Sequence, residues 1–351
     1  MGDRFGRVEA DVISQRKFQT LDGLRGLAAA AVVMFHLHHY FPAIWRPVSA
    51  YLAVDLFFAL SGFVLAEAYS RKLDEGLSFG GFMRKRLLRL WPLYALGLVV
   101  AVLTLGTRVA LGQAPAQDLT PILPAALMLP WPSSDGPLYP LNIAAWSLFF
   151  ELIANALMVL TWRWLSRTVL TTIVALSAVG LAASALAYGS LDFGFTLDGA
   201  PTALARVMFS FFLGVLIWRA KPVAPRISPW VPVLGLALIL VCSPSPTLRP
   251  AFDMLAVTML LPALLWTGAA AEPGPRSLPL FKAAGAVSYA VYVTHVPIMN
   301  GVSRTLDALT PLDRATVGTG AALAALAALL VLAWGLNAGD VRLRRWLARA
   351  G

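Results

Sequence analysis

Residues 21–41 read LDGLRGLAAAAVVMFHLHHYF, an apolar run long enough to cross a membrane that nevertheless contains Asp22, Arg25 and His36. Ten residues separate Arg25 from His36. In a helix each residue turns by about 100°, so the eleven steps from Arg25 to His36 come within about 20° of three whole turns. Both side chains therefore share one helix face, and they lie about 16 Å apart along its axis. Ionisable residues within a span are costly and indicate a functional site. We therefore expect one end of this helix to hold an anion while the other end performs proton chemistry.

The composition is that of an integral membrane protein. Of 351 residues, 58% are hydrophobic and 13% are charged, and the mean hydropathy is +0.72; a soluble domain carries about 25% charged residues. Continuous apolar runs predict an all-α, polytopic membrane helix bundle rather than a β-barrel, whose strands alternate in polarity. About ten transmembrane helices are expected, at 22–40, 51–69, 87–106, 143–161, 168–188, 202–219, 230–243, 251–268, 283–301 and 315–336.

Basic residues orient these spans. With both termini in the cytoplasm, 22 of the 28 basic residues fall on the cytoplasmic side, as the positive-inside rule requires. The net charge of +10 therefore marks a membrane leaflet and not a nucleic-acid-binding face. The six exceptions on or near the outer side are Arg46, Arg108, Arg206, Arg249, Arg304 and Arg314.

The same topology predicts three segments and no cleavable signal peptide. Residues 1–21 form a cytoplasmic N-terminal segment, 22–340 the transmembrane domain and 341–351 a basic cytoplasmic tail. Residues 1–20 are polar and lack the separate short apolar region of a signal peptide.

Ionisable residues recur at similar depth in five predicted spans. We estimate the depth of each residue from a rise of 1.5 Å per residue and a hydrocarbon core about 30 Å thick. By this estimate five ionisable residues lie in the outer half of the membrane: His36, Asp55, Glu151, Arg206 and His295. Such residues are tolerated where they face one another or a cavity. Ser147 and Tyr292 lie on the same helix faces as Glu151 and His295. We therefore predict a polar site inside the bundle.

A second cluster lies at the inner surface, in the segment FMRKRLLRLWPLY that precedes the third span. Arg86 and Arg89 are three residues apart and so project to one side. Arginine offers planar, multidentate donors that suit phosphate. This segment is the predicted anion-docking surface.

Each signal has a structural alternative. Arg84 to Arg89 would serve as ordinary positive-inside anchors, Arg25 would pair locally with Asp22, and His36 would be a packing histidine. Three near-adjacent histidines do not share a helix face, and the single cysteine excludes an internal disulfide and a cysteine-based metal site, so no metal is expected. Gly62, Gly97 and Gly214 are expected to serve helix packing.

The chain resembles the membrane acyltransferase family 3, which comprises integral-membrane O-acyltransferases that modify sugars. Five motifs carry the resemblance in order: FQTLDGLRGLAAAAVVMFH (18–36), VDLFFALSGFVL (54–65), RKRLLRLWPLY (84–94), AAWSLFFELIANAL (144–157) and VSYAVYVTHVPIM (287–299). Two departures occur: Glu151 stands alone where many relatives carry two adjacent acidic residues, and Thr294 replaces a common tryptophan.

The resemblance implies an O-acetyltransferase of the bacterial cytoplasmic (inner) membrane. The donor would be an acyl-CoA, usually acetyl-CoA, whose phosphates meet Arg25, Arg86 and Arg89 on the cytoplasmic side. The acceptor would be a carbohydrate hydroxyl, in an exopolysaccharide, a lipopolysaccharide or a lipo-oligosaccharide.

The resemblance and the chemistry of the residues together suggest roles at the reacting centre. His36 would act as general base or take the acyl group transiently. Asp55 or Glu151 would orient its imidazole, as the acid does in a triad. Arg206 or Tyr292 would donate to the oxyanion, and His295 would bind the acceptor or support His36.

Two rival classes remain. A transporter or exporter of a glycan or small metabolite also places charged residues inside a bundle, although the sequence shows no inverted repeat. A non-catalytic membrane scaffold has no use for a buried layer of histidines and acids.

Overall fold

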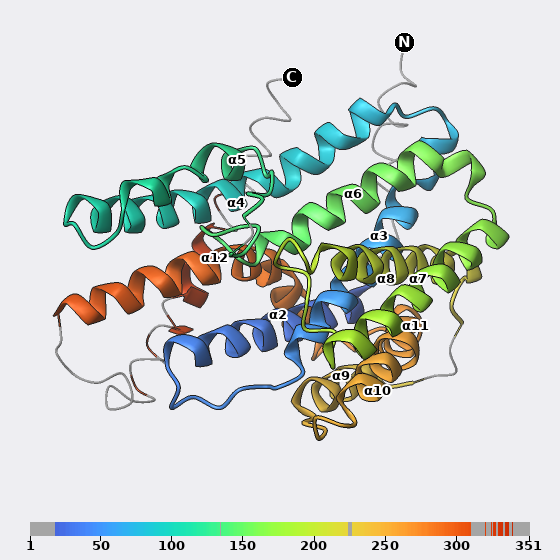
Figure 1. The fold of residues 1–351 in the computed structure, drawn as a ribbon. Coiled ribbons are helices and arrows are strands. Elements are labelled where there is room, and N and C mark those ends of the chain that lie inside the picture. Colours follow the sequence, from blue (N-terminus) through green and yellow to red (C-terminus); the bar gives the residue numbers. More distant parts are fainter. Residues whose placement is uncertain are drawn as a thin grey trace, which may run out of the picture.

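The computed structural model describes residues 18–309, apart from 134 and 224–226, and scattered positions between 320 and 339. The described chain forms a helix bundle without a named strand, which confirms the predicted all-α class (Figure 1). Its α-helices are α2 (Gln19–Tyr40), α3 (Ala53–Asp74), α4 (Phe79–Ala110), α5 (Ile122–Ala126), α6 (Ala145–Thr161), α7 (Arg167–Tyr188), α8 (Ala200–Ala220), α9 (Trp230–Val241), α10 (Arg249–Leu255), α11 (Leu261–Ala270) and α12 (Leu278–Leu309).

Seven helical segments of the described chain are long and apolar enough to cross a membrane, with α10 and α11 joined into one by a π-helical turn. The shorter α9 and the long α12 are not among these seven, so the count of ten and the cytoplasmic termini stay predictions. Residues 1–17, most of the expected span at 315–336 and the tail at 341–351 lie outside the described residues.

Local sequence sets where the helices begin and end. The hydroxyl of Ser78 accepts the N–H of Gly81 at the start of α4, and Ser166 accepts the N–H of Val169 at the start of α7. Gly189 ends α7 in the left-handed region, with a φ of 71° that favours glycine. With the Ser78 cap, α4 begins two turns before residue 87, where the third membrane span is predicted to begin, so Arg86 lies inside the helix. The bounds of that span in the membrane stay a prediction.

Small residues bring α3 and α8 into backbone contact. A Cβ at Gly62 of α3 would overlap the backbone of Phe211, and a Cβ at Gly214 of α8 would overlap the backbone of Ala59. Close approach through small residues is how helices associate in membranes, where the hydrophobic effect does not drive packing. The predicted packing role of both glycines is confirmed.

The same device joins α2 to α12, its most extensive partner. A Cβ at Gly26 of α2 would overlap Ala284 of α12, and a Cβ at Gly285 of α12 would overlap the side chain of Asp22 of α2. These contacts fix two helices that are far apart in sequence side by side along their length (Figure 1).

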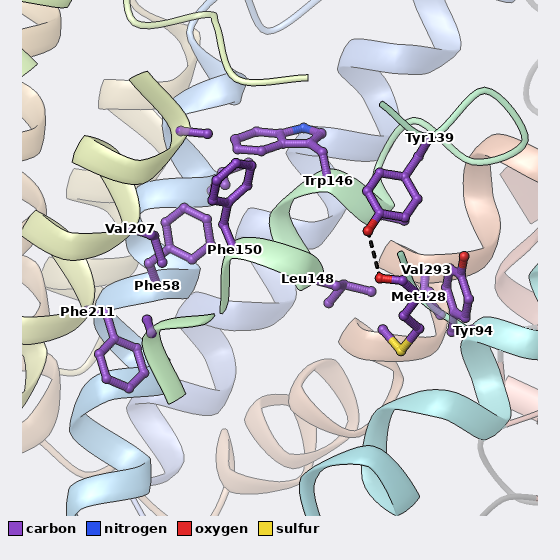
Figure 2. Close-up of a cluster of buried hydrophobic side chains, with 14 of the residues drawn as sticks. Phe58, Tyr94, Met128, Tyr139, Trp146, Leu148, Phe150, Val207, Phe211 and Val293 are labelled. Carbon is purple, nitrogen blue, oxygen red and sulfur yellow. Dashed lines mark hydrogen bonds between the residues drawn. The ribbon is translucent and has the colours of Figure 1, made fainter. Parts of the chain in front are cut away.

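An aromatic core fills the centre of the bundle between α3, α6 and α8 (Figure 2). Trp146 of α6 contacts Phe58 and Phe150 edge-on, with ring centroids 6.4 Å and 6.2 Å apart. On the other side of α6, the Tyr139 hydroxyl donates to the Met128 carbonyl at 2.7 Å, which anchors the segment between α5 and α6.

We expect Gly62→Val to destabilise the protein by about 1–3 kcal/mol or more, because the added atoms meet backbone that cannot rotate away. The measurement is the thermal unfolding midpoint of the detergent-solubilised protein. Gly106→Val is the matched control, since nothing lies within 4 Å of a Cβ at that position of α4. Equal midpoints for the two variants would contradict the proposed close contact.

Candidate functional site

Two histidines from opposite ends of the sequence meet inside the bundle. His36 of α2 and His295 of α12 lie with ring centroids 5.0 Å apart, and His36 Nδ1 is 3.3 Å from His295 Nε2. His295 is completely buried, whereas His36 is partly exposed. The packing of α2 along α12 therefore creates a histidine pair that neither helix carries alone.

The hydrogen-bond partners of the pair assign its tautomers. His295 Nδ1 lies 2.6 Å from the carbonyl of Tyr292, and His36 Nδ1 lies 3.0 Å from the carbonyl of Val32. A carbonyl only accepts, so in two neutral rings each Nδ1 carries the hydrogen. His295 Nε2 then accepts from His36, and His36 Nε2 keeps the lone pair that a general base needs.

Asp55 and Arg206 form a buried ion pair, and each side chain is only 1% exposed. Arg206 Nη2 and Nε donate to the two carboxylate oxygens at 2.6 Å and 3.2 Å. Arg206 also donates to the carbonyls of Tyr51 (2.9 Å) and Phe193 (3.0 Å). This bidentate pair joins α3 to α8 and to the segment that follows α7.

Glu151 forms a second ion pair, which is less buried than the first. Its Oε1 accepts from Arg86 Nη2 at 2.7 Å and from the Ser61 hydroxyl of α3 at 2.6 Å. Ser61 lies six residues after Asp55, so this pair is about 9 Å further along α3. Among the described contacts neither carboxylate binds a histidine, because a guanidinium occupies each. The expected contact of Asp55 or Glu151 with the His36 imidazole therefore has to be corrected.

The three arginines predicted to bind an anion do not form one surface. Arg86 is buried against Glu151, contrary to its predicted place at the inner boundary. Arg25 bonds to Asp22 Oδ1 at 2.7 Å and reaches the Gly285 carbonyl and the Ser288 hydroxyl of α12, both at 2.9 Å.

Asp22 is the point where the other two arginines meet. The side chains of Arg25 and Asp22 remain about one-third exposed, and exposed Arg89 acts electrostatically on Asp22. The local pair of Arg25 with Asp22, which was the structural alternative, is thus present. It belongs to a partly exposed cluster in which two arginines act on one carboxylate.

Tyr292 lies beside the histidine pair. Its hydroxyl shares a 2.7 Å hydrogen bond with Ser147 of α6, and its ring centroid is 6.0 Å from that of His295. The predicted polar faces of α6 and α12 therefore meet. The hydroxyl is next to the site, whereas the N–H groups of Arg206 are used by Asp55 and two carbonyls.

One residue near the histidines escaped the sequence argument. Arg46 stacks on Phe35 with 3.9 Å between guanidinium and ring centroid, and Phe35 in turn contacts His36. Arg46 Nε is buried and has no hydrogen-bond partner in the part of the chain that the structure describes. One feature of the sequence could have identified Arg46, since it is one of the six basic residues that depart from the positive-inside pattern.

The charge of Arg46 also reaches a buried acid in the segment after α7. Burial raises the pKa of Asp192, while the guanidinium charges of Arg206 and Arg46 oppose that rise. Asp192 therefore interacts electrostatically with arginines from two different parts of the chain. Within the described residues no three His, Cys, Asp or Glu side chains gather as metal ligands.

Comparison with known proteins gives two matches. A family model described as "Acyltransferase domain" matches residues 18–337. The curated "Protein 2 in picA locus" of Rhizobium radiobacter is 40% identical over 187 residues, which cover 48% of this chain and 95% of that protein. No solved structure matches the chain.

We expect Asp55→Asn to cost about 3–5 kcal/mol of stability, because it leaves the buried Arg206 charge uncompensated. Thermal unfolding in detergent measures the loss. Glu75→Gln, which removes one partner of the exposed Arg71–Glu75 pair, is the control and should leave the midpoint almost unchanged. A similarly small effect at Asp55 would show that the pair does not hold α3 and α8 together.

Proposed function

The chain belongs to the acyltransferase family whose model it matches over residues 18–337, and from that premise we propose that it moves an acetyl group from acetyl-CoA to a carbohydrate hydroxyl. The acceptor would be an exopolysaccharide, a lipopolysaccharide or a lipo-oligosaccharide. The observation that carries the proposal is the His36–His295 pair, which supplies an imidazole lone pair inside a membrane-type bundle. Family membership favours this enzyme over a transporter.

In this proposal His36 acts as the general base. Its Nε2 takes the proton of the acceptor hydroxyl as that oxygen attacks the thioester carbonyl. The carbon–sulfur bond then breaks, the proton passes to the departing thiolate, and His36 returns to its neutral form. Transient acylation of His36, the alternative route, uses the same lone pair.

His295 takes the supporting role first expected of a carboxylate. The bond from His36 Nδ1 to His295 Nε2 holds the imidazole in the required tautomer and stabilises its positive charge as it develops. The Tyr292 carbonyl fixes the orientation of His295 in turn. The Asp55–Arg206 pair joins α3 to α8, and the Glu151–Arg86 pair joins α6 to α4. Of these helices, α3 packs against α2 and α4 packs against α12, the helices that carry the histidines.

Two groups are placed to meet the negative charge that develops on the carbonyl oxygen. Arg46 has a partner-free Nε and approaches His36 from the outer side. The Tyr292 hydroxyl, bound to Ser147, lies on the other flank. Donors of this kind stabilise an oxyanion most strongly where water is excluded.

The charge pattern favours entry of the two substrates from opposite sides. In the proposed orientation, the cytoplasmic cluster of Arg25 and Arg89 receives the phosphates of the donor. His36 lies about 16 Å further along α2, in the outer half of the membrane. The acceptor would then approach from the outside, past Arg46 and the segment after α7. We propose the bacterial inner membrane as its location, as the family resemblance implies.

We expect His36→Ala to lower acetyl transfer by about 10²–10⁴-fold without lowering the amount of protein in the membrane. The assay follows label from radiolabelled acetyl-CoA into glycan in membranes that express each variant. His39→Ala, at an exposed position on the same helix, is the control and should keep full activity. Normal transfer by a well-folded His36→Ala protein would refute the catalytic role.

We expect Arg89→Gln to raise the KM for acetyl-CoA about tenfold or more at unchanged kcat, because a hydrogen bond to a charged group contributes about 1.5–3 kcal/mol. Steady-state kinetics with varied donor concentration make the measurement. Arg84→Gln removes an equally exposed charge from the same helix and should leave the KM unaltered. Equal KM values for the two variants would speak against phosphate docking at Arg89.

A further inference from the structure

A cavity of about 590 Å³ opens at the end of the bundle opposite the histidine pair. It lies where α2 begins and where α3, α6, α8 and α11 end, which is the cytoplasmic side in the proposed orientation. None of the residues assigned above to catalysis or to donor binding lines it. Four of its lining residues are aromatic and five are charged.

Two indole rings form a fixed wall of this cavity. Trp162 and Trp218 lie with ring centroids 6.3 Å apart at an interplanar angle of 44°. The Trp162 N–H donates to Asp74 Oδ1 at 2.8 Å, and the Trp218 N–H donates to Glu67 Oε2 at 2.7 Å. The indoles are thus held in place, and among the described residues no hydrogen bond is made by the second oxygen of either carboxylate, so each can accept from an amino group.

The charged rim supplies cations beside this wall. Arg163, Arg219 and Lys221 line the cavity, and Arg219 lies over the Trp162 ring at 5.7 Å. Arg163 and Lys221 are exposed. Guanidinium and ammonium groups next to an aromatic face recognise phosphates attached to a flat base.

We propose that this cavity binds the nucleotide end of the acyl-CoA donor, with the base against Trp162 and Trp218 and the ribose phosphate at Arg163, Arg219 and Lys221. The carboxylates of Glu67 and Asp74 accept from the exocyclic amino group of the base. This inference rests on the proposed acyl transfer, since it is the donor that carries such a nucleotide.

The course of α2 connects the cavity to the reacting centre. Phe18, which immediately precedes α2, lines the cavity, and His36 follows 18 residues later, about 27 Å along the helix axis. Arg25 lies between them and, with Arg89, receives the diphosphate. A donor with a long flexible arm could therefore keep its nucleotide in the cavity while its thioester approaches His36.

The test compares nucleotide binding with acyl transfer in the full-length protein in detergent. Adenosine 3′,5′-bisphosphate is the probe, because it carries the base and phosphates without the thioester arm. In wild type it should compete with acetyl-CoA. In Arg163→Gln/Lys221→Gln the probe should bind roughly tenfold more weakly or worse, and the KM for acetyl-CoA should rise in parallel at unchanged kcat.

The altered residues are exposed, so the double variant should fold normally, as thermal unfolding will verify. Arg71→Gln, another exposed cation at the end of α3 that does not line the cavity, is the matched control and should resemble wild type.

Two failures are distinguishable. If wild type transfers acetyl groups but the double variant binds the probe normally and keeps its KM, the cavity assignment is overturned and the enzyme proposal is left intact. An absence of both transfer and acetyl-CoA binding in wild type would overturn both. Competition by a phospholipid headgroup such as glycerophosphoglycerol, but not by the bisphosphate probe, would reassign the cavity to lipid.

Discussion

Every charge that this bundle takes out of water has to be matched by an opposite charge or by hydrogen-bond partners, and the arrangement of the helices follows from that requirement. The Asp55–Arg206 pair fastens α3 to α8, and the Glu151–Arg86 pair fastens α6 to α4. Removing one member of such a pair leaves the other as a buried charge, which costs more than the intact pair contributes. These two pairs therefore hold α3 to α8 and α6 to α4, and α3 and α4 in turn pack against α2 and α12.

The histidine pair depends on a different constraint, the absence of side chains at the contact between α2 and α12. Gly26 and Gly285 allow the two backbones to approach until His36 and His295 share a hydrogen bond. In the proposed mechanism, a neutral imidazole takes the place that a carboxylate occupies in many catalytic triads. That substitution suits an apolar interior, because a neutral acceptor needs no counter-charge until the reaction creates one.

The two ends of the bundle differ in chemistry, and the proposed function uses that difference. Cations and indoles gather where α2 begins, whereas histidines, Tyr292 and Arg46 gather towards its other end. α2 links the two ends, with Arg25 between them. An acyl donor held at one end and an acceptor admitted at the other would meet without either crossing the membrane, which is the reason we favour transfer over transport.

The sequence alone was sufficient for the helical class, the ordered motifs and the identity of most polar residues at the site, because apolar length and helical periodicity are local properties. It also indicated the packing glycines Gly62 and Gly214. It did not determine pairing: Glu151 and Asp55 were expected at an imidazole, and each is instead held by an arginine from another helix. Arg86 was expected on an anion-docking surface, and it is instead buried against Glu151 of another helix. The sequence suggested that His295 supports His36, but the geometry of that contact and the place of Arg46 beside it emerged only in three dimensions. The contacts of a helix face depend on which helix packs against it, and that is decided by shape and charge across the whole bundle.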